Sequence, residues 1–309
     1  MVMTTVLLAL AWFAALNLAA SLFAWTAAGG LQRIRICPRA GVLLTVRLFP
    51  AAASLLLTLV LFVPAHWITE PRGLSESFGS SVYLLSLAGA ALIGRAIVRV
   101  IGLARADRRL RGRERVSAVV PHLRESDALP GLALAGLLRT RILAGPHVVG
   151  TLTSPELDVA IAHELAHHRA VDNLKRWALY CTPDFFGWSA TARKAERDWH
   201  AAAESLADAR AVGGDAQRAI DLASALIKVA RLSLERPRVE TALWSTFNDP
   251  SLLKHRVLQL TRGIPVAAPS HPRRAASTAV LAVGAVAMLV PLLSDTIHTI
   301  TEAVIAFLP

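Results

Sequence analysis

Four apolar stretches, each long enough to cross a lipid bilayer, constrain the fold of this chain more than any other feature. They cover about residues 4–27, 48–68, 81–101 and 275–293. An α-helix needs about 20 apolar residues to span the hydrocarbon core of a bilayer. Hydrophobic residues make up 54% of the chain, which is high for a water-soluble domain of this length. We therefore expect a polytopic, mainly α-helical membrane protein with four transmembrane helices.

The basic residues predict how these helices are oriented. Four arginines and no acidic residue follow the first stretch, within residues 29–47, whereas residues 69–80 contain one arginine and two glutamates. Arginine-rich loops stay in the cytoplasm, so both termini are expected outside. No Lys or Arg precedes the first stretch, which favours a retained membrane helix over a cleaved signal peptide.

The net charge of +11 would also suit a nucleic-acid-binding protein. The arginines, however, gather beside the apolar stretches and do not alternate with aromatic residues, so membrane topology explains them and no direct nucleic-acid partner is expected. The densest basic cluster, residues 105–115, predicts contact with anionic membrane lipid. The two cysteines are not in a metal-binding spacing.

We expect three regions along the chain. Residues 1–103 form a membrane domain with three helices, residues 104–274 form one cytosolic domain, and residues 275–309 hold the fourth helix and a short outer tail. The middle region has no apolar stretch of membrane length and is long enough to bury its own core.

The chemistry centres on the segment His163-Glu164-Leu165-Ala166-His167. It lies in a predicted helix from about Pro155 to Val171, with Ser154 as a possible N-cap. Histidines four residues apart share a helix face and can bind one Zn²⁺, while Glu164 is directed at a water molecule beside the metal. The alternative is a helix whose histidines are only solvated or hydrogen-bonded.

A catalytic zinc needs a third protein ligand, and Glu204 is the candidate. It stands in an alanine-rich helical run with Asp208 one turn later, where Asp208 can orient a histidine ligand through its second ring nitrogen. The alternative for Glu204 is an exposed residue on a surface helix. Three other residues compete as ligands but rank lower: His168, His200 and Asp172, the last of which can instead cap the next helix.

Other segments of the middle region predict ordinary secondary structure. Residues 141–150 suggest one or two short strands, whose edge beside the zinc helix would suit an extended peptide. Helices are expected at 215–234 and 250–260. Lys254, His255 and Arg256 are expected to form a solvated face, with oxyanion stabilisation by His255 or Arg256 as the alternative.

The order of three apolar stretches, a cytosolic HExxH domain and a fourth stretch resembles the BlaR/MecR-type membrane metallopeptidases. The motif residues that carry the resemblance are the HExxH segment, Asp172 five residues after it, and the run from Glu204 to Asp208. The resemblance implies a zincin-like helical domain with a small β-sheet, in which His163, His167 and Glu204 bind zinc, Glu164 is the catalytic base and Asp208 supports a ligand. It further implies regulatory cleavage of a protein such as a winged-helix repressor. The sensors of that family carry an extracellular penicillin-binding domain that this chain does not include, and His168 replaces a residue that is usually apolar in them.

Three functions are compatible with these features. The first is a membrane zinc endopeptidase that cuts a cytosolic or membrane-proximal polypeptide in signalling. The second is a housekeeping protease similar to HtpX or the CAAX proteases, although HtpX-like proteins have two spans after the HExxH helix. The third is a zinc-stabilised receptor or scaffold that does not cut its partner, for which Glu164 would be unnecessary. The sequence does not identify the substrate, the activating signal, the oligomeric state or any self-cleavage.

Overall fold

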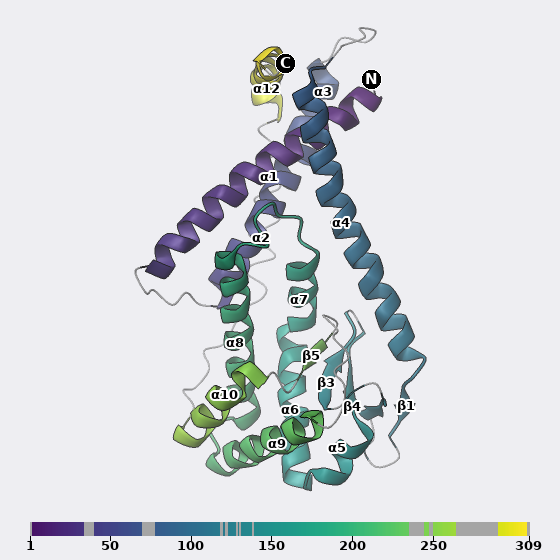
Figure 1. The fold of residues 1–309 in the computed structure, drawn as a ribbon, viewed down its shortest axis with the longest axis vertical. Coiled ribbons are helices and arrows are strands. Elements are labelled where there is room, and N and C mark those ends of the chain that lie inside the picture. The colour runs from purple at the N-terminus through teal and green to yellow at the C-terminus, as the bar shows by residue number, and fades with distance from the viewer. Residues whose placement is uncertain are drawn as a thin grey trace. The chain divides into compact units, whose positions relative to one another are not determined.

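The computed structural model describes residues 2–33, 40–69, 78–117, 120, 123–127, 129, 131–137, 139–234, 244–246, 250–263 and 290–307 (Figure 1). The chain divides into two compact units. The helical unit comprises Met1–Val98, Thr182–Glu196 and Pro269–Pro309, and the sheet unit comprises Arg99–Cys181 and Arg197–Ala268. The structure does not test the three sequence regions predicted above, so their boundaries stay predictions.

Three helices of the described chain are long and apolar enough to cross a membrane. The first is α1 (Val2–Arg33). The second runs without a break through α2 (Ala40–Leu56), a π-helix η1 (Leu57–Phe62) and α3 (Val63–Thr69). The third is α4 (Ser80–Arg111), so the first three apolar stretches form helices as predicted, with longer bounds.

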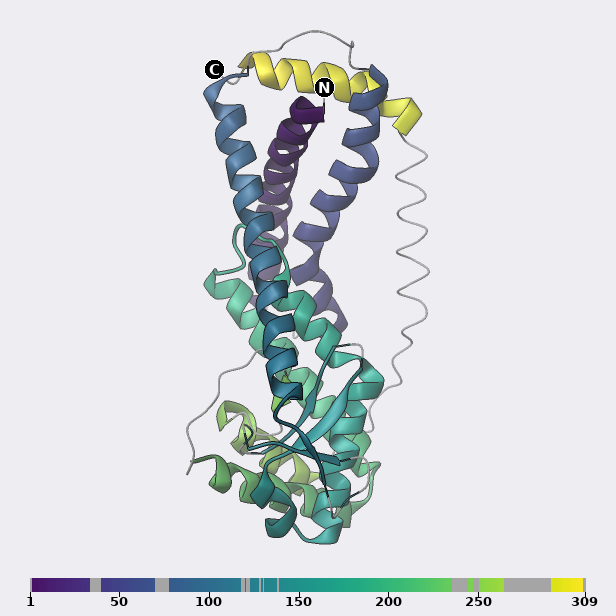
Figure 2. The ribbon, with the colours of Figure 1, turned by 90° about the vertical axis from the view of Figure 1, so that its right-hand side faces the viewer.

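The predicted fourth span lies mostly within residues 264–289, outside the described residues. The helix α12 (Val290–Phe307) begins at its end and packs against α3 and η1 (Figure 2).

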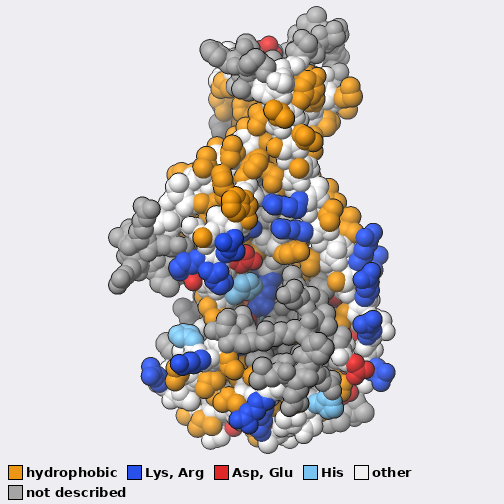
Figure 3. All heavy atoms as spheres, in the orientation of Figure 1, with side chains coloured by type: hydrophobic (Ala, Val, Ile, Leu, Met, Phe, Trp, Pro, Cys, Tyr) orange, Lys and Arg blue, Asp and Glu red, His pale blue; other side chains and the backbone are white. Residues whose placement is uncertain are grey.

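The helical unit exposes many large apolar side chains. They cover its surface in Figure 3, and they include Phe23, Phe49, Leu59, Tyr83 and Leu87. A protein surrounded by water rarely exposes contiguous apolar patches of this kind. This surface and the three apolar helices are consistent with membrane association.

Small residues allow α1 and α4 to approach closely. The Ser86 hydroxyl of α4 donates to the Leu7 carbonyl of α1 at 2.8 Å. A Cβ atom added to Gly89 would lie 2.3 Å from the carbonyl oxygen of Leu10. Helices in membranes commonly pack through such small residues, because they bring the backbones together.

A buried carboxylate fixes the loop Thr182–Ser189 within the helical unit. Asp184 is fully buried and accepts hydrogen bonds from the Ser21 hydroxyl at 2.8 Å, the Trp25 indole at 3.1 Å and the Arg47 guanidinium at 3.0 Å. A buried charge is tolerated only when it is paired and hydrogen-bonded. These contacts therefore hold the loop against α1 and α2.

Within the described residues, the sheet unit contains five short strands in the order β1-β2-β4-β3-β5. Only β2 and β4 pair in parallel; the other neighbours are antiparallel. The prediction of a strand near residue 141 is confirmed by β4, but His147–Gly150 is helical, because Pro146 begins the short helix α5 (Pro146–Thr151). The strands are β1 (Arg115–Val116), β2 (Leu123–Glu125), β3 (Leu132–Ala135), β4 (Arg141–Ala144) and β5 (Trp244–Thr246).

Five longer helices complete the sheet unit. They are α6 (Ser154–Ala170), α7 (Asp172–Cys181), α8 (Ala190–Val212, whose first residues belong to the helical unit), α9 (Ala216–Leu234) and α10 (Pro250–Arg262). The core forms where α6 packs on β3 and α9 (Figure 1). The four helices predicted in this region, at 155–171, around Glu204, at 215–234 and at 250–260, are confirmed.

The ends of α6 differ in detail from the prediction. Thr153, not Ser154, is the N-cap, because the backbone N–H of Thr153 donates to the Glu156 carboxylate at 2.8 Å in a capping box. Val171 ends the helix in the left-handed conformation with φ 56°. The turn at Val171 allows α7 to start at the very next residue.

Candidate metal site

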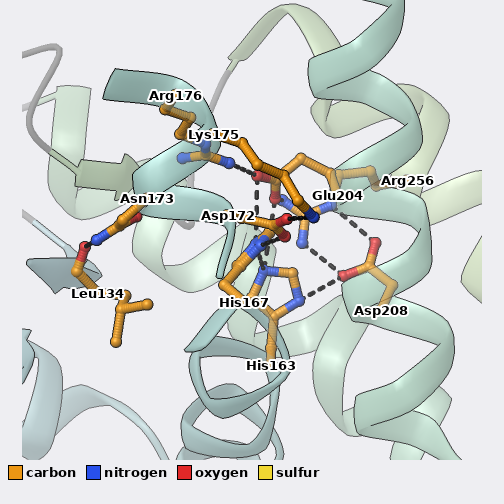
Figure 4. A network of polar contacts seen from close by, with 10 residues as sticks. All are labelled: Leu134, His163, His167, Asp172, Asn173, Lys175, Arg176, Glu204, Asp208 and Arg256. Atoms are coloured by element: carbon orange, nitrogen blue, oxygen red, sulfur yellow. Dashed lines mark hydrogen bonds and ion pairs between the residues drawn. The ribbon is translucent and has the colours of Figure 1, made fainter. Parts of the chain in front are cut away.

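Helix α6 brings the two motif histidines together inside the sheet unit. His163 and His167 lie on one face of the helix and are both fully buried (Figure 4). Their Nε2 atoms are 3.2 Å apart. Spacing of four residues on a helix explains this approach without any long-range contact.

Helix α8 supplies the third member of the group. Glu204 places one carboxylate oxygen 3.4 Å from Nε2 of His163 and the other 3.4 Å from Nε2 of His167. These three buried side chains are the group within the described residues that could hold a metal ion. The sequence prediction therefore named residues that the fold brings together.

The three groups are close enough to hold one metal ion. The Nε2 atoms of the two histidines are 3.2 Å apart, and each lies 3.4 Å from a different carboxylate oxygen of Glu204. Ligands at about 2.0–2.2 Å from a zinc ion lie about 3.3–3.6 Å from one another at tetrahedral angles. Two imidazole nitrogens and a carboxylate are also ligands that zinc accepts, so the residues fit the ion.

Each histidine has a carboxylate behind it. Nδ1 of His163 lies 2.9 Å from Asp208, as predicted, and Nδ1 of His167 lies 2.8 Å from Asp172. The sequence analysis named Asp172 as a lower-ranked ligand or a helix cap and did not predict its contact with His167, because the turn at Val171 that directs it back toward His167 has no sequence signal. A carboxylate at Nδ1 fixes the tautomer and leaves Nε2 free to bind a metal.

These contacts change the acidity of the groups. Burial opposes the charged form of His167, but Glu204 and Asp172 outweigh it and raise its pKa to about 9. Burial likewise opposes ionised Glu204, yet His167 and Arg256 keep its pKa well below the usual range. The site thus favours positive charge at the point where the histidines and Glu204 meet.

Glu164 differs from the histidines and Glu204 in its hydrogen bonding. It is fully buried, and neither carboxylate oxygen has a hydrogen-bond partner among the described residues. Burial raises its pKa, and the nearby charges of His163 and His167 only partly oppose this effect. A buried carboxyl group without hydrogen-bond partners lowers the stability of the fold, which makes it a candidate for a functional role. A raised pKa suits a group that accepts and returns a proton.

Two arginines also enter the site; the sequence analysis did not name Arg176, and it placed Arg256 near the reaction only as an alternative. The expectation of a solvated face at residues 254–256 is wrong for Arg256, which is buried, whereas Lys254 and His255 are exposed. Leu253, Val257 and Leu260 pack into the core and turn Arg256 inward. Arg256 pairs with Asp208 at 2.6 Å and with Glu204 at 3.0 Å. Arg176 of α7 donates to Glu204 at 2.8 Å.

Of the three competing ligands, Asp172 contacts His167 but is outside the group that could hold a metal, and the other two lie elsewhere. His168 is exposed, and its Nδ1 is 2.6 Å from the Thr140 hydroxyl. His200 is half-buried, with its ring against Trp199 at a centroid distance of 5.0 Å. Neither belongs to the group that could hold a metal. No model of a known protein family and no curated protein matches this chain.

Proposed function

We propose that this protein is a membrane-bound zinc endopeptidase. The observation that carries the proposal is the convergence of His163, His167 and Glu204 in one buried group that could hold a metal ion, next to Glu164, whose carboxylate has no hydrogen-bond partner among the described residues. A site that only stabilised the fold would have no need for Glu164. The buried acidic groups, which among the described residues pair with the buried arginines Arg176 and Arg256, also suit a divalent cation.

In this proposal His163, His167 and Glu204 hold the zinc. Zinc bound in such a site lowers the pKa of water and polarises a carbonyl group. Glu164 takes the proton of the attacking water and later gives it to the leaving amine of the peptide. Asp172 and Asp208 keep both imidazoles oriented with Nε2 toward the centre of the site.

The substrate we propose is a cytosolic or membrane-proximal polypeptide. The arginine-rich loops favour a cytosolic site. The resemblance to the BlaR/MecR-type peptidases suggests cleavage in regulatory signalling, with a winged-helix repressor as one candidate.

The test combines metal analysis with one conservative substitution in the full-length protein in detergent. We expect about one zinc per chain in wild type and in Glu164→Gln. Cleavage of casein, used as an unfolded polypeptide, and of the chain itself should fall by several orders of magnitude in Glu164→Gln, because the proton acceptor is lost while the helix is kept.

Asp158→Asn is the matched control, since Asp158 is an exposed acidic residue on the same helix. It should cut like wild type. Equal cleavage by Glu164→Gln would remove Glu164 as the base. Bound zinc with no cleavage of either polypeptide by wild type would favour a receptor or scaffold instead.

A further inference from the structure

The two arginines of the site are engaged to different degrees (Figure 4). Arg256 uses all three guanidinium nitrogens: Nε and Nη2 donate to Asp208, and Nη1 lies 3.0 Å from Glu204. Arg176 places only Nη2 on Glu204, and its Nε is buried without a hydrogen-bond partner among the described residues. Arg176 thus keeps donor capacity inside the site that Arg256 has already used.

Helix α7 directs the side chain of Arg176 toward the candidate metal site. Arg176 follows Asp172 by one helical turn, so both side chains project from the same face. Asp172 contacts His167, and Arg176 contacts Glu204. The guanidinium therefore lies beside the proposed zinc ligand Glu204.

An arginine in this position has the properties of an oxyanion stabiliser. Its side chain is 9% exposed, so its charge acts where water is largely excluded. A guanidinium stays protonated at any physiological pH and offers five N–H donors in a fixed plane. A donor left unsatisfied in the interior is available to a substrate oxygen at no cost to an existing contact.

We propose that Arg176 binds the carbonyl oxygen of the scissile peptide bond and stabilises the negative charge that develops there. This inference rests on the proposed peptidase function and deepens it. The water oxygen forms a bond to the carbonyl carbon, the carbonyl π electrons move to the oxygen beside Arg176, and the water proton moves to Glu164. The electron pair on that oxygen then re-forms the C=O bond as the C–N bond breaks, the C–N electron pair stays on nitrogen, and Glu164 protonates the amine.

The test measures binding of two zinc-directed probes to the zinc-loaded full-length protein. A dipeptide phosphoramidate carries a tetrahedral anionic group like the attacked carbonyl, whereas acetohydroxamate only chelates the metal. Arg176→Gln should weaken phosphoramidate binding by about 10²-fold, the effect of losing one oxyanion donor. Its zinc content and its affinity for acetohydroxamate should stay within about threefold of wild type, because Arg256 still supports Glu204.

Arg169→Gln, which removes an exposed arginine on α6, is the matched control and should bind both probes like wild type. The inference alone is overturned if Arg176→Gln binds the phosphoramidate as wild type does. It is also overturned if zinc and both affinities fall together, since Arg176 would then only support Glu204. Failure of the wild type to take up zinc would refute the proposed metal site and this inference with it.

Discussion

Because of the turn at Val171, Asp172 both begins α7 and contacts His167. It is the first residue of α7, and its carboxylate accepts a hydrogen bond from Nδ1 of His167 at 2.8 Å. Lys175 holds its other oxygen at 2.9 Å. Burial would raise the pKa of Asp172, but His167 and Lys175 lower it, so the carboxylate is ionised where it contacts the ring. An ionised partner makes the imidazole a better metal ligand.

We predict that Asp172→Asn lowers zinc affinity by about 10- to 100-fold, the usual effect of losing a carboxylate behind a histidine ligand. Asparagine keeps the size of the side chain and its ability to start a helix. The measurement is competition with a chelator of known affinity. His168→Ala, which alters an exposed neighbour of His167, should retain wild-type affinity; zinc loss there would reassign the ligands.

Sequence spacing was sufficient to predict the site residues of α6. It was insufficient to predict the residues that reach the site through tertiary packing. His163, Glu164 and His167 are placed by helix geometry alone. Glu204 and Asp208 could be proposed because they share a face one turn apart on a second helix. Arg176 and Arg256 reach the site only because α7 and α10 pack beside it, and a buried arginine has the same sequence appearance as an exposed one.

At the level of elements, the start of α6 depends on a buried glutamate. Glu156 accepts from the Thr153 backbone at 2.8 Å, from the Ser224 hydroxyl at 2.5 Å and from Lys228 at 2.7 Å. Burial favours its neutral form, but these hydrogen bonds prevail and lower its pKa to about 2. Two of the partners belong to α9, so Glu156 both caps α6 and fixes it to its neighbour.

We predict that Glu156→Gln destabilises the protein by about 1–2 kcal/mol at pH 7. A carboxylate whose pKa is lowered on folding stabilises the folded state above its unfolded pKa of about 4.5 and loses this contribution as the pH falls toward 2. Thermal unfolding of both proteins at several pH values tests this. The deficit of the variant should be largest above pH 5 and shrink toward pH 3; a deficit independent of pH would contradict the assignment.

Elements with a long periodic pattern were predictable, and short ones were not. The apolar stretches and α9 have enough residues for their character to be clear. By contrast, β3 has four residues, Leu132–Ala135, all buried, so it shows no alternation to mark a strand. Its identity is set by pairing with β4, the next strand along the chain, and with β5, which comes from a distant part of the sequence.

For the whole molecule, orientation in the membrane follows from charge. We predict that the turn at Gly213 between α8 and α9 is cytoplasmic and that both termini are outside. An alkaline phosphatase fusion, active only outside the cytoplasm, should be inactive at Gly213 and active at Gly79. Activity at Gly213 would overturn the topology and the cytosolic substrate together.

The burial of Asp184 bears on how such a protein can evolve. A domain that is continuous in the sequence can be moved to another protein by a single recombination event. Here Thr182–Glu196 interrupts the segment that carries Asp172 and Glu204, yet belongs with the helical unit. A gene fragment beginning at residue 99 would encode the buried acid but leave behind Ser21, Trp25 and Arg47. A gene fragment that encodes the candidate metal site would therefore have to include these apolar helices for the loop around Asp184 to keep its partners.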